Sequence, residues 1–131
     1  MTVKPCCGFL KLCLTNLCHS QHRPIKSKPA TTSEFADTIK RNDTVLVDIR
    51  SKREYSEGHI AGATNVVWTD ATFRTDFEKL AIGKEKTIAI YCLRGRRSKA
   101  AAMVLAEMGY TVVNLNGGIR AWQTDCRETV R

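Results

Sequence analysis

The sequence predicts an α/β fold with a central, mostly parallel sheet and helices on both of its faces. Short β-branched, apolar segments of the kind found in buried strands alternate along the chain with segments that have helical apolar spacing. Glycine and other turn residues separate one segment from the next. Regular strand–helix alternation is typical of parallel sheets, because a crossover between parallel strands needs a connection as long as a helix.

The first helix and the first strand follow each other closely. Thr31 and Glu34 have the spacing of a capping box, which predicts a helix near residues 33–41. The segment 44–49 (TVLVDI) is β-branched and largely apolar, which predicts a buried strand.

A short helix and a short strand are expected next. Ser51 and Glu54 repeat the capping-box spacing, and Gly58 stands where such a helix would end. Residues 63–67 then predict a second strand. Beyond it, Asp70 is the expected cap of a helix with apolar residues at helical spacing, and Gly83 is expected to stop that helix.

The second half of the sequence repeats the alternation. The segment 87–91 (TIAIY) predicts a strand, and residues 98–108 predict a helix with one apolar face. Gly109 follows that helix in the position of a left-handed C-terminal residue. Residues 111–115 predict the fourth strand, and a final short helix is expected at 119–124.

Residues 1–30 differ from the rest of the chain. They contain no acidic residue, hold four of the six cysteines and end in two X–Pro pairs. We therefore expect a poorly ordered, basic, cysteine-rich leader or linker at 1–30 and one domain at 31–131. The leader lacks an uninterrupted apolar segment, so a cytoplasmic location is expected, with a weak export or organelle-targeting segment as the alternative.

Composition excludes several classes of protein. No apolar run is long enough to span a membrane, and the leader cysteines lack paired C-x-x-C spacing, so neither a membrane span nor a metal or other cofactor is expected. The net charge is +8, and four cations cluster at 94–99. Without interleaved aromatic residues or a recognition motif, this cluster favours a small anion over nucleic acid.

Cys92 is the candidate catalytic residue. It directly follows the strand at 87–91, at the carboxyl end where parallel sheets bind ligands. Free backbone amides, a helix dipole and three guanidinium groups favour the thiolate there, which is the reactive nucleophile. The loop after it supplies the candidate substrate-binding residues, which are Leu93, Arg94, Gly95, Arg96, Arg97 and Ser98.

The simpler interpretation is a buried structural cysteine beside solvated arginines. Three arginines at a helix N-terminus oppose the helix dipole, however, and this favours a functional site. A phosphatase of the Cys-x5-Arg type needs an arginine six residues after the cysteine, where this sequence has Ser98. The shorter cradle favours a sulfur atom attached to the cysteine over a phosphoryl group.

Four motifs occur in the order and spacing of one family: Asp48-Ile49-Arg50; Glu54-Tyr55 with residues 58–63 and Asn65; residues 91–98; and residues 117–122. On these motifs the sequence resembles the single-domain rhodaneses over residues 31–131. The resemblance implies a rhodanese-like fold and a thiosulfate-type sulfur donor. It also implies ping-pong sulfur transfer through a persulfide on Cys92.

The remaining motif residues are expected to support the site structurally. They are Asp48, Arg50, Glu54, His59 and Trp122. Asp48 and Arg50 are expected to position Arg97 or to pair with Glu54, and His59 is weighed as a general base against a role in satisfying backbone groups. Cys126 is either inert or a resolving cysteine for Cys92.

The expected partners are small molecules. The donor is a small anion that carries sulfur, and the acceptor is cyanide or a thiol, with a thioredoxin-like protein among the candidates. A monomer is expected. The alternatives are a persulfide-relay or partner-docking module with weak turnover, and an enzyme similar to phosphatases or arsenate reductases.

Overall fold

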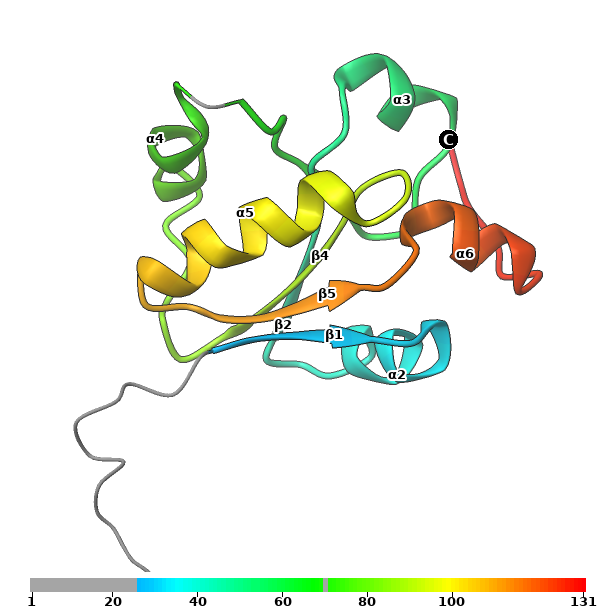
Figure 1. Cartoon of the computed structure of the whole chain (residues 1–131), viewed down its shortest axis with the longest axis horizontal. Coiled ribbons are helices and arrows are strands. Elements are labelled where there is room, and N and C mark those ends of the chain that lie inside the picture. Colours follow the sequence, from blue (N-terminus) through cyan, green and yellow to red (C-terminus); the bar gives the residue numbers. More distant parts are fainter. Residues whose placement is uncertain (1–25, 70) are drawn as a thin grey trace, which may run out of the picture.

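Five parallel strands form the central sheet of the computed structural model, which describes residues 26–69 and 71–131 (Figure 1). Their order across the sheet is β1-β5-β4-β2-β3. The strands are β1 (Ser27–Ala30), β2 (Thr44–Asp48), β3 (Thr64–Asn65), β4 (Thr87–Tyr91) and β5 (Thr111–Leu115). β4 lies in the middle of the sheet, so its carboxyl end is surrounded by neighbouring elements.

Helices cover both faces of the sheet (Figure 1). They are α2 (Thr32–Ile39), α3 (Lys52–Glu57), α4 (Phe73–Glu78), α5 (Arg96–Glu107) and α6 (Gly118–Thr124). α4 and α5 pack on one face and α2 and α6 on the other. None of the helices in the described ranges is long and apolar enough to cross a membrane. The predicted α/β class and the parallel sheet are confirmed.

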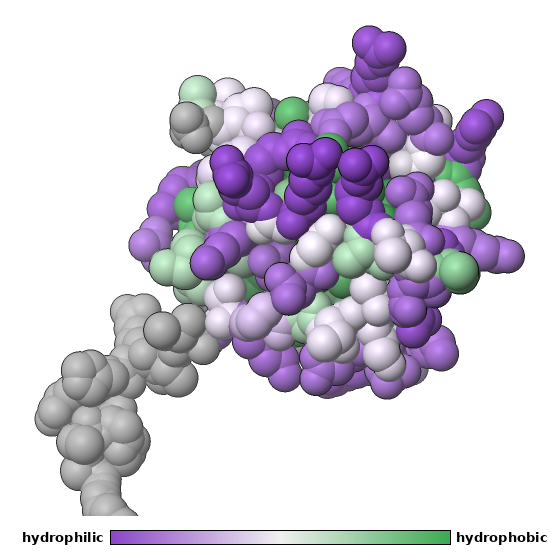
Figure 2. Space-filling view, turned by 45° about the vertical axis from the view of Figure 1, so that its right-hand side comes forward, coloured by the Kyte–Doolittle hydropathy of each residue, from purple (hydrophilic) through white to green (hydrophobic). Residues whose placement is uncertain are grey.

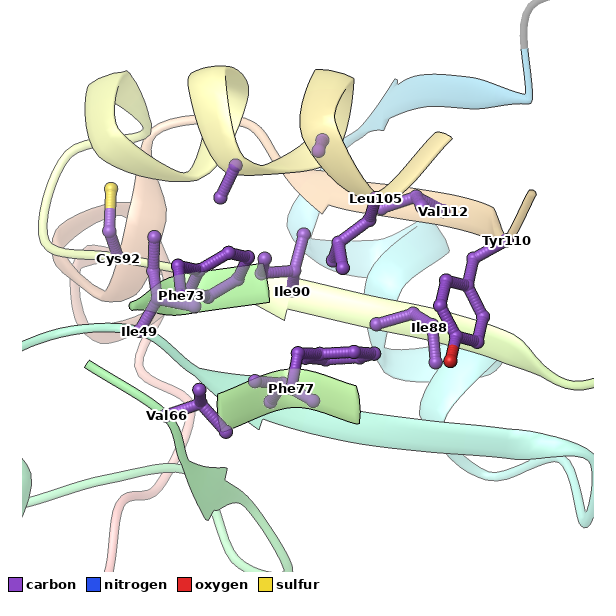
Figure 3. Close-up of a cluster of buried hydrophobic side chains, with 13 residues drawn as sticks. Ile49, Val66, Phe73, Phe77, Ile88, Ile90, Cys92, Leu105, Tyr110 and Val112 are labelled. Carbon is purple, nitrogen blue, oxygen red and sulfur yellow. The ribbon is translucent and has the colours of Figure 1, made fainter. Parts of the chain in front are cut away.

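Two buried apolar layers hold the helices against the sheet. The α5-side core includes Ile49, Phe73, Phe77, Ile88, Ile90, Cys92, Leu105 and Val112 (Figure 3). The α2-side core includes Phe35, Leu46, Ala89, Tyr91, Val113, Leu115, Ile119 and Trp122. Cys92 directly follows β4 and belongs to the α5-side core, so apolar packing holds it in place.

Both predicted capping boxes are present. Thr31 caps α2 with Glu34, and Ser51 caps α3 with Glu54. In each pair the hydroxyl accepts a backbone N–H, and the carboxylate accepts the N–H of the capping residue. These helix starts were predictable because they depend on contacts only three residues apart.

Strand β1 corrects the predicted leader boundary. Residues 27–30, which the sequence assigned to the leader, pair in parallel with β5 at the edge of the sheet. The segment contains Pro29 and is largely exposed, so no apolar pattern predicts it. An edge strand tolerates proline because only one side of it makes ladder hydrogen bonds. The rest of the predicted leader lies outside the described residues, as does Asp70.

Two further helix boundaries differ from the prediction. α5 begins at Arg96, two residues before the predicted start, because Gly95 takes a left-handed conformation (φ 99°) and the helix starts directly after it. α4 ends at Glu78, well before Gly83. Ala81 adopts a positive φ of 53° soon after that end, so the chain leaves the helical path without a glycine.

Candidate active site

The loop between β4 and α5 turns two backbone amides toward the sulfur of Cys92. The N–H of Gly95 lies 3.1 Å from Sγ, and the N–H of Ser98 lies 3.3 Å from it. Figure 3 shows Sγ directed toward the first turn of α5. Cys92 is 1% exposed. These amides have no other acceptor in the helix, so the sulfur takes the place of a helix-capping group.

The first turn of α6 holds the outer side of this loop. Ile119 donates its N–H to the Cys92 carbonyl oxygen at 2.9 Å, and Arg120 donates to that of Leu93 at 3.1 Å. Gly118 has a positive φ of 64°, and a side chain there would collide with the backbone of Leu93. Because the loop carbonyls are bound on the outside, the loop amides face inward.

Burial and hydrogen bonding act in opposite directions on the Cys92 thiol. Burial raises its pKa, because it penalises the charged form. Hydrogen bonds from the Ser98 hydroxyl and from the amides of Ser98, Gly95 and Arg94 outweigh that penalty. The Ser98 hydroxyl lies 3.3 Å from the Gly95 carbonyl oxygen and can rotate toward the sulfur. The net pKa of Cys92 is lowered, as the loop sequence predicted.

A cavity of about 420 Å³ opens over the cysteine. It is lined by Cys92, Leu93, Arg94, Arg96 and Arg97. The structure thus brings together five of the seven residues predicted for catalysis and binding, while Gly95 and Ser98 contribute the amides below the sulfur. Arg94 and Arg96 are exposed and take part in none of the ion pairs among the described residues. Their charges are available to an anion.

The third arginine of the loop is already paired. Arg97 Nη1 and Nη2 lie 3.1 and 3.2 Å from the two carboxylate oxygens of Glu54, which gives a bidentate ion pair. Hydrogen bonding to Arg97 lowers the pKa of Glu54 to about 2 despite its partial burial. This contact fixes the start of α5 relative to α3.

Asp48 and Arg50 form a separate, buried ion pair. Arg50 Nη2 lies 2.6 Å from Asp48 Oδ2 and donates to the Gly58 carbonyl oxygen at 2.7 Å. The expectation that Asp48 and Arg50 position Arg97 or pair with Glu54 is therefore wrong, since Glu54 holds Arg97 and Asp48 holds Arg50. The spacing of Asp48 and Arg50 on one strand end allows them to pair with each other.

Two supporting residues were missed by the sequence analysis. The Tyr91 hydroxyl accepts the N–H of Ile60 at 3.0 Å, and burial together with the nearby Asp48 raises the pKa of Tyr91. Asn65 donates to the carbonyl oxygens of Asp48 and Arg50, both at 2.9 Å. Both residues belong to the matched motifs, and this was the available signal. Tyr91 thus holds the end of β4 to Ile60, and Asn65 holds β3 to the end of β2.

His59 and Trp122 are held by contacts within the fold. His59 stacks on Tyr55 with ring centroids 3.8 Å apart, and its Nδ1 lies 2.9 Å from the Tyr55 carbonyl oxygen. Trp122 is 6% exposed, and its indole N–H donates to the Glu128 carbonyl oxygen. Neither lines the cavity over Cys92.

Disulfides and clusters of potential metal ligands are both absent from the described part of the chain. Cys126 is exposed and, like Cys92, forms no disulfide with any described cysteine. Nowhere in the ranges 26–69 and 71–131 do three or more His, Cys, Asp or Glu side chains gather in a way that would hold a metal ion.

Comparison with known proteins shows which family the chain is similar to. The model of the Rhodanese-like domain matches residues 31–125. The chain is 34% identical over 92 residues to a thiosulfate sulfurtransferase, GlpE, of Pseudomonas fluorescens, and the match covers 70% of this chain and 81% of that protein. It is 37% identical over 92 residues to a sulfurtransferase of Allochromatium vinosum, covering 70% and 79%.

Two other similar proteins are a longer enzyme and a protein of known structure. The chain is 31% identical over 118 residues to a tRNA uridine(34) hydroxylase of Wigglesworthia glossinidia brevipalpis, and the match covers 86% of this chain but only 35% of that protein. The crystal structure of a rhodanese-related protein of Thermoplasma volcanium has a TM-score of 0.69 at 25% identity, and the match covers 79% of this chain and 97% of that one.

The Glu54–Arg97 pair makes folding stability depend on pH. The pKa of Glu54 in the folded chain, about 2, lies below its ordinary 4.5, so the stabilisation is complete above about pH 4.5 and is lost as pH falls toward 2. We expect Glu54→Gln to lower the free energy of unfolding at pH 7 by about 1 kcal/mol, a value limited by the solvent exposure of both side chains.

Urea denaturation of both proteins at a series of pH values checks this. The difference between wild type and Glu54→Gln should shrink steadily below pH 4.5. Glu57→Gln is the matched control, because Glu57 lies on the same helix in an exposed pair with Arg53, and it should be neutral throughout. A Glu54→Gln effect that does not change with pH would contradict the assignment.

Proposed function

The chain belongs to the rhodanese-like domain family, and we propose that it is a sulfurtransferase that moves sulfane sulfur from thiosulfate, or a similar anionic donor, through a persulfide on Cys92. The observation that supports this most strongly is the pair of amides held 3.1 and 3.3 Å from Sγ. They stabilise a thiolate before the reaction and face the place where a sulfur-bound negative charge would form during it.

In the first half of the reaction the Cys92 thiolate attacks the outer sulfur of thiosulfate. A sulfur–sulfur bond forms to Sγ, the bond between the two donor sulfurs breaks, and sulfite leaves with the electron pair. The charge of the thiolate passes to the outer sulfur of the persulfide, so the step needs no external oxidant or reductant. The exposed guanidinium groups of Arg94 and Arg96 favour the approach of the dianionic donor.

In the second half a nucleophile removes the sulfur. Cyanide or a thiolate attacks the outer sulfur of the persulfide, the bond to Sγ breaks, and Cys92 leaves as the thiolate. The same amides that favour the thiolate in the free protein make it a good leaving group here. The first half-reaction therefore starts from the Cys92 thiolate and the second regenerates it, as a ping-pong sequence requires.

Two alternatives from the sequence are less well supported. A phosphatase-like enzyme needs a guanidinium group at the position of Ser98, but the side chain of Ser98 is buried against the loop. A partner-docking module needs neither a low thiol pKa nor an anion pocket over the cysteine, whereas a persulfide relay needs the low thiol pKa but no pocket for a free anionic donor. Both features are present, and this favours a catalyst.

Replacing the nucleophile tests the proposal. We expect Cys92→Ser to show no detectable sulfur transfer from thiosulfate to cyanide, because a serine hydroxyl cannot carry the persulfide. After wild-type protein is treated with thiosulfate, mass spectrometry should find one added sulfur on the peptide that contains Cys92.

The control for this experiment is Cys126→Ser, since Cys126 is exposed and does not line the cavity. It should retain both the activity and the added sulfur. Circular dichroism should show that Cys92→Ser is folded. Turnover by folded Cys92→Ser, or sulfur added elsewhere instead, would refute the assignment.

The free arginines should govern donor binding. We expect Arg94→Gln and Arg96→Gln each to raise KM for thiosulfate by about three- to tenfold, because one charge-assisted contact to the donor is lost in a solvent-exposed site. Alkylation of Cys92 by neutral iodoacetamide should change little, because the amide cradle remains.

Steady-state kinetics with peptide-resolved alkylation measures both quantities. Arg53→Gln is the matched control, because it removes a surface arginine distant in sequence from the loop. An unchanged KM in both loop variants would remove the role of these arginines in binding the donor.

A further inference from the structure

Three guanidinium groups line the pocket over Cys92, and one of them is neutralised. They belong to Arg94, Arg96 and Arg97. Arg97 forms the bidentate pair with Glu54, whereas the other two take part in no ion pair within the described part of the chain. Figure 2 brings the end of the molecule with α3 and α6 toward the reader, and strongly hydrophilic side chains gather there. A single carboxylate therefore cancels one of the three positive charges of this pocket.

The carboxylate of Glu54 is held in place by its own helix. Its Oε1 accepts the backbone N–H of Ser51 at 3.0 Å, which is half of the α3 capping box, and the same oxygen accepts Arg97 Nη1 at 3.1 Å. Arg97 lies in the first turn of α5, and its long side chain is 37% exposed. Because the cap fixes the carboxylate, Arg97 is the partner that can turn toward a ligand.

Arg97 lies between two anions. Hydrogen bonding to Glu54 is the main cause that raises the pKa of Arg97, and the charge of the Cys92 thiolate acts in the same direction. Burial and the nearby guanidinium group of Arg50 oppose this shift of the pKa. Arg97 is thus within electrostatic reach of both Glu54 and Cys92. A dianionic donor over Cys92 would be a third anion near Arg97, and it would have to displace Glu54 to form a bidentate contact.

Displacement of Glu54 gives the donor little net affinity. A guanidinium group that leaves a carboxylate for another anion exchanges contacts of the same kind, so the paired Arg97 adds little to donor binding. The displaced carboxylate would also stand unpaired near a dianion, and the repulsion between them costs free energy. Without the charge of Glu54, Arg97 would be free for the donor. One charge-assisted contact in a partly exposed site is a factor of about three to ten in affinity.

We propose that Glu54 is a specificity-determining residue of the cysteine pocket, because it competes with the anionic donor for Arg97. The competition weakens the binding of every anion in the pocket, including the sulfite that leaves, so sulfite is released more readily. Glu54 does not line the cavity and acts only through Arg97. This inference rests on the proposed function and deepens it, since it names the residue that limits how tightly the anionic donor is bound.

The test is a double-variant cycle in the full chain, with thiosulfate as the donor and cyanide as the acceptor. Glu54→Gln keeps the capping box, which accepts glutamine at that position, and removes one negative charge. We expect it to raise kcat/KM for thiosulfate, which reports on the first half-reaction alone, by about three- to tenfold. The inhibition constant of sulfite should fall by a similar factor. An unchanged or lower kcat/KM for thiosulfate would overturn the inference.

The second variant of the cycle shows whether Glu54 acts through Arg97. Glu54→Gln combined with Arg97→Gln removes one charge of each sign, so kcat/KM for thiosulfate should return to within about twofold of the wild-type value. A double variant that keeps the gain would contradict the inference. Glu57→Gln is the matched control, because it removes the same charge from an exposed pair on the same helix. It should behave like wild type, and an equal gain there would assign the effect to net charge alone.

A donor with less charge separates electrostatics from a change of structure. Methanethiosulfonate carries one negative charge where thiosulfate carries two, so the gain in kcat/KM of Glu54→Gln should be smaller with methanethiosulfonate. Equal gains with both donors would point to a rearranged pocket and would contradict the inference. If circular dichroism shows that Glu54→Gln is unfolded, Arg97→Gln and the double variant still differ by the charge of Glu54. Arg97→Gln should then have the lower kcat/KM for thiosulfate, and equal values would overturn the inference.

The outcomes separate this inference from the proposed function. If wild-type protein transfers sulfur from thiosulfate to cyanide and Glu54→Gln has the same kcat/KM, the role of Glu54 is wrong and the sulfurtransferase assignment stands. If wild-type protein neither transfers sulfur nor gains a sulfur on Cys92 from thiosulfate, the proposed function is wrong and this inference fails with it.

Discussion

The site depends on one contact, in which two backbone amides of the loop donate to the buried sulfur of Cys92. The N–H groups of Gly95 and Ser98 can face Sγ only if the loop carbonyls turn outward, and the first turn of α6 supplies their donors. That contact requires the glycine at 118, whose positive φ and close approach to Leu93 exclude a side chain. Hydrogen bonds thus join Cys92, the loop after it and α6 into one unit. The packing of Cys92 against the sheet fixes the position of that unit.

The charged residues around this unit divide into two groups. Arg50 and Arg97 are each bound by one carboxylate, and they connect the ends of β2, α3 and α5. Arg94 and Arg96 have no partner among the described residues and line the pocket over Cys92. A charge without a partner is available to a substrate, and we therefore propose that Arg94 and Arg96, rather than the paired Arg97, bind the donor.

The sequence predicted the features that depend on local pattern. The capping boxes at Thr31 and Ser51, the buried strands and the cysteine at the end of β4 all follow from contacts or spacing within a few residues. Strand β1, the pairing of Arg97 with Glu54 and the contact of α6 with the loop join segments far apart in the chain. No local pattern predicts them, because the fold alone brings those segments together.

The amide cradle should make Cys92 a thiolate at lower pH than an ordinary cysteine. Its most direct test is the pH dependence of Cys92 alkylation by iodoacetamide, resolved by peptide mass spectrometry in the folded protein and in urea. We expect half-maximal reactivity in the folded chain at a lower pH than in urea, where the amide hydrogen bonds are lost. An equal or higher midpoint in the folded chain would show that burial outweighs the amide hydrogen bonds, and the cradle would then not activate the cysteine.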